Sequence, residues 1–169
     1  IILWRALGHI QSGFYVDVGA NDPEVDSVTK AFYDRGWRGI NIEPVPKWFD
    51  KLKANRNRDI NLNVAAGNVD GSLALFEIPN TGLSTLSREI AQRHKHESGY
   101  EFIERLVPVT RLTDIIAAHH SGPIHFLKID VEGAEREVLQ GLDLDKLRPW
   151  IILVEATLPN LPTGNHDAW

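Results

Sequence analysis

The sequence contains no cysteine and no methionine. Without cysteine, the chain has no disulfide, no thiolate nucleophile and no zinc–thiolate site. Because the chain begins with Ile1 and lacks any methionine, we expect an N-terminal piece of the natural protein to be missing. A chain of 169 residues can bury a sizeable core without disulfides or a structural metal, so we expect one domain over residues 1–169.

Long apolar runs and clusters of basic residues are also absent. The longest nearly uncharged runs, such as 150–154, are far shorter than the roughly 20 residues that span a bilayer. We therefore expect no membrane span and a cytoplasmic protein. The formal net charge is −5 and the 18 lysine and arginine residues are scattered, which argues against a nucleic-acid partner and favours a small neutral or cationic ligand.

Short apolar segments alternate with segments of helical periodicity. We expect buried strands at 14–18, 39–42, 60–66, 124–130 and 150–155. This alternation predicts an α/β fold with a mostly parallel, doubly wound sheet and helices on both faces. The doubly wound order places the first strand beside the fourth, and ligands of such sheets bind at this switch point.

Apolar spacing predicts helices over 25–36, 45–52, 110–119 and 134–141. Residues 72–78 alternate as an antiparallel partner of the third strand.

The polar segment 80–102 is predicted to form a loop and a surface helix that begins near Ser87, and it could act as a lid. A short strand follows at 106–109, where Pro108 indicates an edge position because proline cannot donate a ladder hydrogen bond.

Four carboxylates fall at the carboxyl ends of predicted parallel strands: Asp17, Glu43, Asp130 and Glu155. Ligands of doubly wound sheets lie outside these strand ends, so the four acids would rim one site. Such a site attracts hydroxyl, ammonium, sulfonium or metal groups. The alternative is that strand ends are polar simply because they are exposed.

The turn after the first strand carries a single glycine, Gly19. The dinucleotide fingerprint uses three glycines, whereas Asn21 and Glu24 fill the second and third positions and Asp22 adds negative charge. This turn would repel phosphates and favours a nucleoside with a positive centre, such as S-adenosylmethionine. Glu43 lies 24 residues after Gly19, near the spacing at which an acid accepts ribose hydroxyls.

Several segments carry a family resemblance: YVDVGANDP at 15–23, DSVT at 26–29, GWRG at 36–39, IEP at 42–44, LKIDVEGAE at 127–135 and VEAT at 154–157. Together they resemble the FkbM-type family of S-adenosylmethionine-dependent methyltransferases, from about Phe14 to the end of the chain. The resemblance implies a Rossmann-like class I methyltransferase fold. It also implies methyl transfer to a hydroxyl of a small molecule, sugar, glycolipid or polyketide.

The resemblance also implies roles for individual residues. Around the methionine part of the cofactor it places Asp17, Gly19, Ala20 and Asn21. It places Glu43 on the ribose, with Pro44 and Ala66 bordering the adenine. His166 would lie near the acceptor side.

Family members usually continue beyond the segment at 165–169 with another helix and a closing pair of strands. We therefore expect the closing strands to be lacking and the apolar face of the fifth strand to be uncovered.

An alcohol is a weak nucleophile, so methyl transfer needs a group that holds or removes its proton. Lys128 precedes Asp130 by two residues on the same strand face, and burial is expected to lower its pKa. It is a candidate base or hydrogen-bond donor; alternatively, it pairs structurally with Glu155 or another acid.

Asp130 and Glu155 end neighbouring strands and could together coordinate Mg²⁺, although we favour a metal-free site. Glu132 and Glu135 flank Gly133 at a helix start, where carboxylates favour the helix dipole and one could instead contact substrate.

Two other functions remain open on the same fold. One is a non-catalytic nucleoside-binding module. The other is a nicotinamide-dependent oxidoreductase, which the missing glycines and Asp22 disfavour.

Overall fold

The structure is a computed structural model that describes residues 2–155. Five parallel strands form the main sheet in the order β3-β2-β1-β7-β8. They are β1 (Phe14–Val18), β2 (Arg38–Ile42), β3 (Ile60–Leu62), β7 (Phe126–Ile129) and β8 (Ile151–Val154). A smaller sheet has the order β4-β6-β5, in which β6 runs parallel to β4 and antiparallel to β5. Its strands are β4 (Ala65–Gly67), β5 (Gly71–Glu77) and β6 (Ile103–Arg111).

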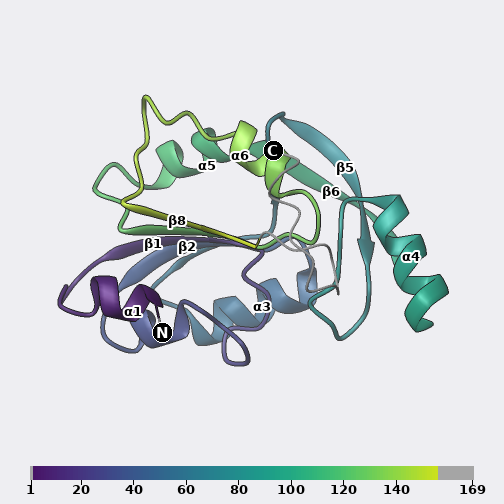
Figure 1. Ribbon diagram of the computed structural model, residues 1–169, viewed down its shortest axis with the longest axis horizontal. Coiled ribbons are helices and arrows are strands. Elements are labelled where there is room, and N and C mark those ends of the chain that lie inside the picture. The colour runs from purple at the N-terminus through teal and green to yellow at the C-terminus, as the bar shows by residue number, and fades with distance from the viewer. Residues whose placement is uncertain (1, 156–169) are drawn as a thin grey trace.

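Helices cover both faces of the main sheet (Figure 1). The helices within the described residues are α1 (Ile2–Leu7), α2 (Lys30–Tyr33), α3 (Pro46–Asn55), α4 (Arg88–Ser98), α5 (Leu112–His119) and α6 (Glu135–Gln140). Figure 1 shows α5 and α6 on one face and α1 and α3 on the other, with α4 at the end of the molecule beside β5 and β6. The doubly wound α/β architecture predicted from the sequence is therefore confirmed, with β1 beside β7.

Successive side chains of β1 point to opposite faces of the sheet and pack into two different hydrophobic clusters. Val16 and Val18 pack in a cluster that includes Ile116 of α5, whereas Tyr15 packs with Phe32 and Trp37 in a second cluster. Asp17 therefore faces the same side as Tyr15. This places a buried carboxylate on the face that α1, α2 and α3 cover.

The helix predicted over 25–36 is mostly wrong, because only α2 is helical. The Asp22 carboxylate accepts the backbone N–H groups of Glu24 and Val25, and Asp26 has a left-handed φ of 54°. These local bonds give the backbone an alternative to the helix. Residues 22–29 form a loop instead.

The strand predicted at 60–66 is divided between the two sheets, and the predicted pairing of 72–78 with it is wrong. At the bend, the Asn63 side-chain amide donates to the carbonyl oxygens of Glu43 and Pro44. β3 pairs with β2, and β4 then leaves to pair with β6. The antiparallel partner of β5 is β6.

The predicted edge strand at 106–109 lies within β6, the central strand of its sheet. Proline is tolerated because β4 pairs only with residues 109–111, so Pro108 has a strand neighbour on one side only. The helix predicted near Ser87 is confirmed, with the Ser87 hydroxyl accepting the Ile90 N–H at 3.3 Å.

The helices predicted at 45–52, 110–119 and 134–141 correspond to α3, α5 and α6, whereas α1 was not predicted. Among the described residues, β8 is one of the two edge strands of the main sheet, and Leu153 on it is 39% exposed. No helix within residues 2–155 has the length and apolarity needed to cross a membrane.

Candidate functional site

Two adjoining cavities open at the carboxyl ends of β1, β2 and β7. The first is an apolar slot. Its apolar walls include Ile42, Val45, Trp48, Ala66, Leu75 and Leu86. Glu43 and Pro44 also line it. The slot therefore offers a flat apolar group a place beside one carboxylate.

The second cavity is a polar chamber. Its charged lining residues are Asp17, Asp26, Lys128, Asp130, Glu132 and Glu155. Ala20 lines it as well. The slot and the chamber meet at a junction of five residues that line both: Gly19, Asn21, Gly82, Asp130 and Glu132.

Gly19 sets the close approach of β1 to β7 at this junction. Its φ is +73°, and a Cβ there would overlap the carbonyl oxygen of Asp130. Its N–H donates to the Ile42 carbonyl at 3.0 Å, so the turn is also bound to β2. A side chain at Gly19 would both strain the backbone and separate the strand ends.

Asn21 is a partly buried residue whose side chain carries an unused hydrogen-bond acceptor. Its backbone is left-handed, with φ 49°, and its side-chain Oδ1 has no hydrogen-bond partner within residues 2–155. A buried acceptor without a donor is costly. A ligand ammonium or hydroxyl at the junction would supply the missing donor.

Glu43 joins two loops at the mouth of the slot. Its side chain is buried, with Oε2 accepting the Asn21 N–H and Oε1 accepting the Val45 N–H, each at 2.8 Å. Burial raises the pKa of Glu43 to about 7, although both hydrogen bonds oppose this. Each oxygen keeps a second lone pair for a further donor.

Lys128 is held by two carboxylates and a carbonyl. Its Nζ lies 3.3 Å from Asp17 Oδ1, 3.3 Å from Asp130 Oδ2 and 2.8 Å from the Gly19 carbonyl. The expected lowering of its pKa is wrong: burial lowers the pKa, but Asp17 and Asp130 outweigh it, and the pKa is raised. Lys128 is therefore a protonated ammonium, paired with acids as the structural alternative predicted.

Three carboxylates gather at the open side of the chamber. One carboxylate oxygen from each of Asp130, Glu132 and Glu155 lies within 4.8 Å of the others. Burial alone would raise the pKa of Asp130, but Lys128 and a hydrogen bond with Glu155 lower it. Lys128 is shared between Asp17 and Asp130, so it brings one positive charge to this group of acids.

Glu132 and Glu135 differ in their surroundings. Glu135 is buried and its carboxylate accepts the N–H groups of Val131 and Gly133, so it fixes the loop before α6. Burial, together with Glu155 and Asp130, raises the pKa of Glu132 to about 8.

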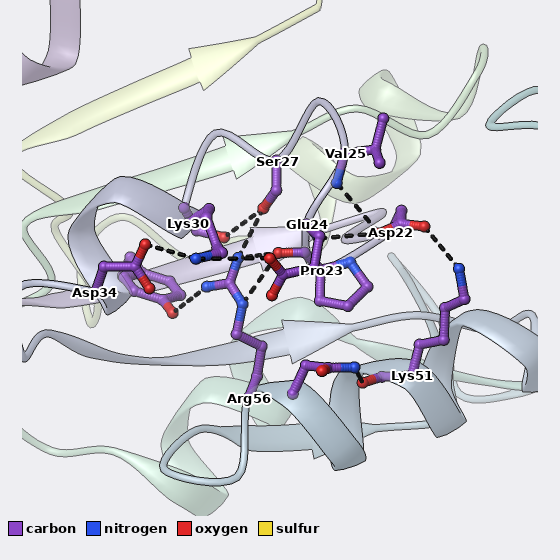
Figure 2. A network of polar contacts seen from close by, with 12 residues as sticks. Asp22, Pro23, Glu24, Val25, Ser27, Lys30, Asp34, Lys51 and Arg56 are labelled. Carbon is purple, nitrogen blue, oxygen red and sulfur yellow. Dashed lines mark hydrogen bonds and ion pairs between the residues drawn. The ribbon is translucent and has the colours of Figure 1, made fainter.

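The wall of the chamber formed by residues 22–29 is anchored by Arg56 (Figure 2). Arg56 is fully buried, and its guanidinium donates to the Pro23 carbonyl at 2.5 and 3.2 Å and to Ser27 Oγ at 3.0 Å. An ion pair between Lys51 Nζ and Asp22 Oδ2, 2.9 Å apart, holds the same loop at a second point. Buried guanidinium groups need several acceptors, and this loop supplies them.

The structure brings the predicted acids together in two groups. Asp17, Asp130 and Glu155 line the chamber, and Glu43 lines the slot. The predicted residue His166 lies outside the described residues.

Sequence reasoning missed Arg56, as well as Trp48 and Leu75 as slot walls. Nothing in the local pattern distinguishes Arg56 from an exposed arginine. Residues 81–86 of the predicted lid segment contribute to the slot, and their movement stays a prediction.

A family model described as the methyltransferase FkbM domain matches residues 17–168 of this chain. The chain belongs to the FkbM methyltransferase family. The match covers the two cavities and the strand ends that form them. The resemblance read from the sequence segments is thereby confirmed.

Two curated fungal proteins are similar to this family member. Methyltransferase sdnD of Sordaria araneosa is 30% identical over 161 residues, covering 77% of this chain and 60% of that protein. Methyltransferase 1 of Beauveria bassiana (strain ARSEF 2860) is 33% identical over 146 residues, covering 77% of this chain and 58% of that protein. The chain thus spans somewhat less than two thirds of the length of these relatives.

A solved structure is also similar. The crystal structure of methyltransferase FkbM from Methylobacillus flagellatus KT matches with a TM-score of 0.48 and 19% identity, over 78% of this chain and 29% of that chain.

Proposed function

We propose that this chain binds S-adenosylmethionine across the slot and the chamber and transfers its methyl group to a hydroxyl of a small molecule or glycan. The observation that carries the proposal is the junction: an apolar slot bordered by Glu43 continues into a polar chamber through Gly19 and Asn21. A nucleoside linked to an amino acid has the same division into a flat apolar part and a charged part.

The residues of the site fit this cofactor. Pro44 and Ala66 would border the adenine, and the Glu43 carboxylate would accept the ribose hydroxyls. Asp17, Ala20 and Asn21 would surround the amino-acid part, whose ammonium offers the donor that Asn21 Oδ1 lacks.

The bound cofactor supplies an electrophilic methyl group on a sulfonium. The chain positions the acceptor and manages its proton, since positioning supplies much of the acceleration in such a displacement. Lys128 keeps Asp17, Asp130 and Gly19 in place as a charged hydrogen-bond donor. Asp130 and Glu155 would orient the acceptor hydroxyl from the chamber side.

The alternative to a metal-free site is Mg²⁺ bound by Asp130 and Glu155. We propose a metal-free site, because the Lys128 ammonium 3.3 Å from Asp130 supplies the positive charge that a cation would otherwise bring. Transfer in excess EDTA should match transfer with added Mg²⁺. A rate that collapses with EDTA and returns with Mg²⁺ would reverse this part of the proposal.

The experiment that tests the function is calorimetric titration of the chain with S-adenosylhomocysteine, with NAD as the matched control. We expect micromolar binding of the first and none of the second. NAD binding alone would favour the oxidoreductase alternative. Binding without transfer to any of a panel of neutral alcohols and glycans would favour the non-catalytic nucleoside-binding module.

A further inference from the structure

The base for methyl transfer must lie where the two cavities meet. If the nucleoside fills the slot and the amino-acid part fills the chamber, the sulfonium and its methyl group lie at the junction. Apart from two glycines, the junction presents three side chains: Asn21, Asp130 and Glu132. A general base has to be within hydrogen-bond reach of the attacking hydroxyl, so among residues 2–155 the candidates are these three, together with Lys128 and Glu155, which line the adjoining chamber.

Four of these five groups are less suited than Glu132. The Asn21 amide has no basic atom at neutral pH. Lys128 is held protonated by Asp17 and Asp130. Asp130 is engaged by the Lys128 ammonium at 3.3 Å, which stabilises its charge and weakens it as a base. Glu155 shares a hydrogen bond with Asp130 and lines the chamber but not the slot.

Glu132 is the remaining group, and its carboxylate makes no hydrogen bond or ion pair within residues 2–155. Its main chain is fixed, because its carbonyl accepts the Thr85 hydroxyl at 2.7 Å. Its φ of 52° is a left-handed conformation that is unfavourable for a glutamate. A fixed backbone whose carboxylate has no partner among the described residues suits a group that serves a ligand.

We propose that Glu132 is the general base that accepts the proton of the acceptor hydroxyl as the methyl group is transferred; this inference rests on the proposed function. The hydroxyl oxygen forms its bond to the methyl carbon while the carbon–sulfur bond breaks and its electron pair stays on sulfur. The hydroxyl proton moves to the Glu132 carboxylate. The products are a methyl ether, S-adenosylhomocysteine and a protonated Glu132, which then returns its proton to water.

The charges that face Glu132 support this role. Glu155, Asp130 and Glu135 raise the pKa of its carboxyl group, and Lys128 opposes them. Together with burial they bring the pKa to about 8. A base whose pKa lies close to the working pH combines a usable fraction of the ionised form with a strong affinity for the proton.

The test compares wild type with E132Q, using E137Q as the matched control. Glu137 lies on α6 and is exposed. With an alcohol that wild type methylates, and with EDTA present, we expect E132Q to lower kcat about 100-fold or more. The Kd of S-adenosylhomocysteine should change less than threefold, and E137Q should match wild type in both.

A kcat of E132Q within threefold of wild type would overturn the proposal for Glu132 and leave the proposed function intact. A loss of cofactor affinity in E132Q as large as its loss of kcat would also overturn the proposal, because Glu132 would then act in cofactor binding. If neither wild type nor variant binds S-adenosylhomocysteine, the proposed function itself fails.

Discussion

Asp17 and Lys128 are direct cross-strand neighbours in the parallel β1–β7 pair, and their Oδ1 and Nζ atoms lie 3.3 Å apart. Both side chains are nearly fully buried. Thr29 donates to the other carboxylate oxygen of Asp17 at 2.9 Å, which connects the pair to the end of the 22–29 loop. The pair thus joins the central strands, the loop and the junction of the two cavities. Breaking one side of a buried pair costs more than the pair contributes to stability.

The first prediction concerns cofactor affinity. Glu43→Ala should weaken binding of S-adenosylhomocysteine by about 1 to 3 kcal/mol, because it removes the carboxylate proposed to accept the ribose hydroxyls. Calorimetry measures the change, with thermal unfolding as a check that the variant is folded. Asp50→Ala, at an exposed position on α3, is the control. An unchanged Kd for Glu43→Ala would exclude the ribose role.

The second prediction concerns pH and stability. Because the native pKa of Glu43 is raised from 4.5 to about 7, the native state binds more protons than the unfolded state between these values. Stability from this group is therefore greatest below pH 4.5 and is lost as the pH rises to 7. Relative to E43Q, the free energy of unfolding of wild type should fall by about 3 kcal/mol across this range. Urea unfolding at several pH values measures it, and a pH-independent difference would contradict the pKa.

The third prediction separates acceptor handling from cofactor binding. If Asp130 orients the acceptor as proposed, Asp130→Asn should lower kcat at least about tenfold, while the Kd of S-adenosylhomocysteine changes much less. Asp145→Asn is the control, since the Asp145 side chain is 97% exposed. Equal losses in kcat and affinity would place Asp130 with the cofactor instead.

The fourth prediction tests the anchor of the chamber wall. Arg56→Met removes the donors that satisfy Pro23 and Ser27 and should destabilise the protein by about 3 kcal/mol, measured by urea unfolding. Arg58→Met, two residues away at an exposed position, should cost less than about 1 kcal/mol. Arg56→Met should also weaken S-adenosylhomocysteine binding, because the loop it holds lines the chamber. Similar stabilities of the two variants would show that Arg56 is not the anchor.

Local patterns in the sequence account for the main sheet. The strands at 14–18 and 39–42 and the helix at 45–52 are predicted because apolar residues recur at the period of each element. Chain order then places β1 beside β7, since parallel strands joined by right-handed crossovers leave few arrangements. From this order alone, Asp17 and Asp130 are expected at one site.

Tertiary contacts decide the features that local patterns misjudge. The apolar spacing after Pro23 indicates a helix, yet Arg56, 33 residues further along the chain, binds the backbone in a loop. Lys128 in an apolar strand suggests a lowered pKa, yet Asp17 on the neighbouring strand reverses the direction.

The sequence by itself thus determined the order of strands and helices and the acids at the strand ends, because these follow from side-chain periodicity and chain connection. Only the tertiary structure decided the charge of Lys128, the path of the 22–29 loop and, within residues 2–155, the lack of a partner for the Glu132 carboxylate. Each of these depends on groups distant in the chain, whose burial and charge fix the energy of a residue only when the fold brings them together.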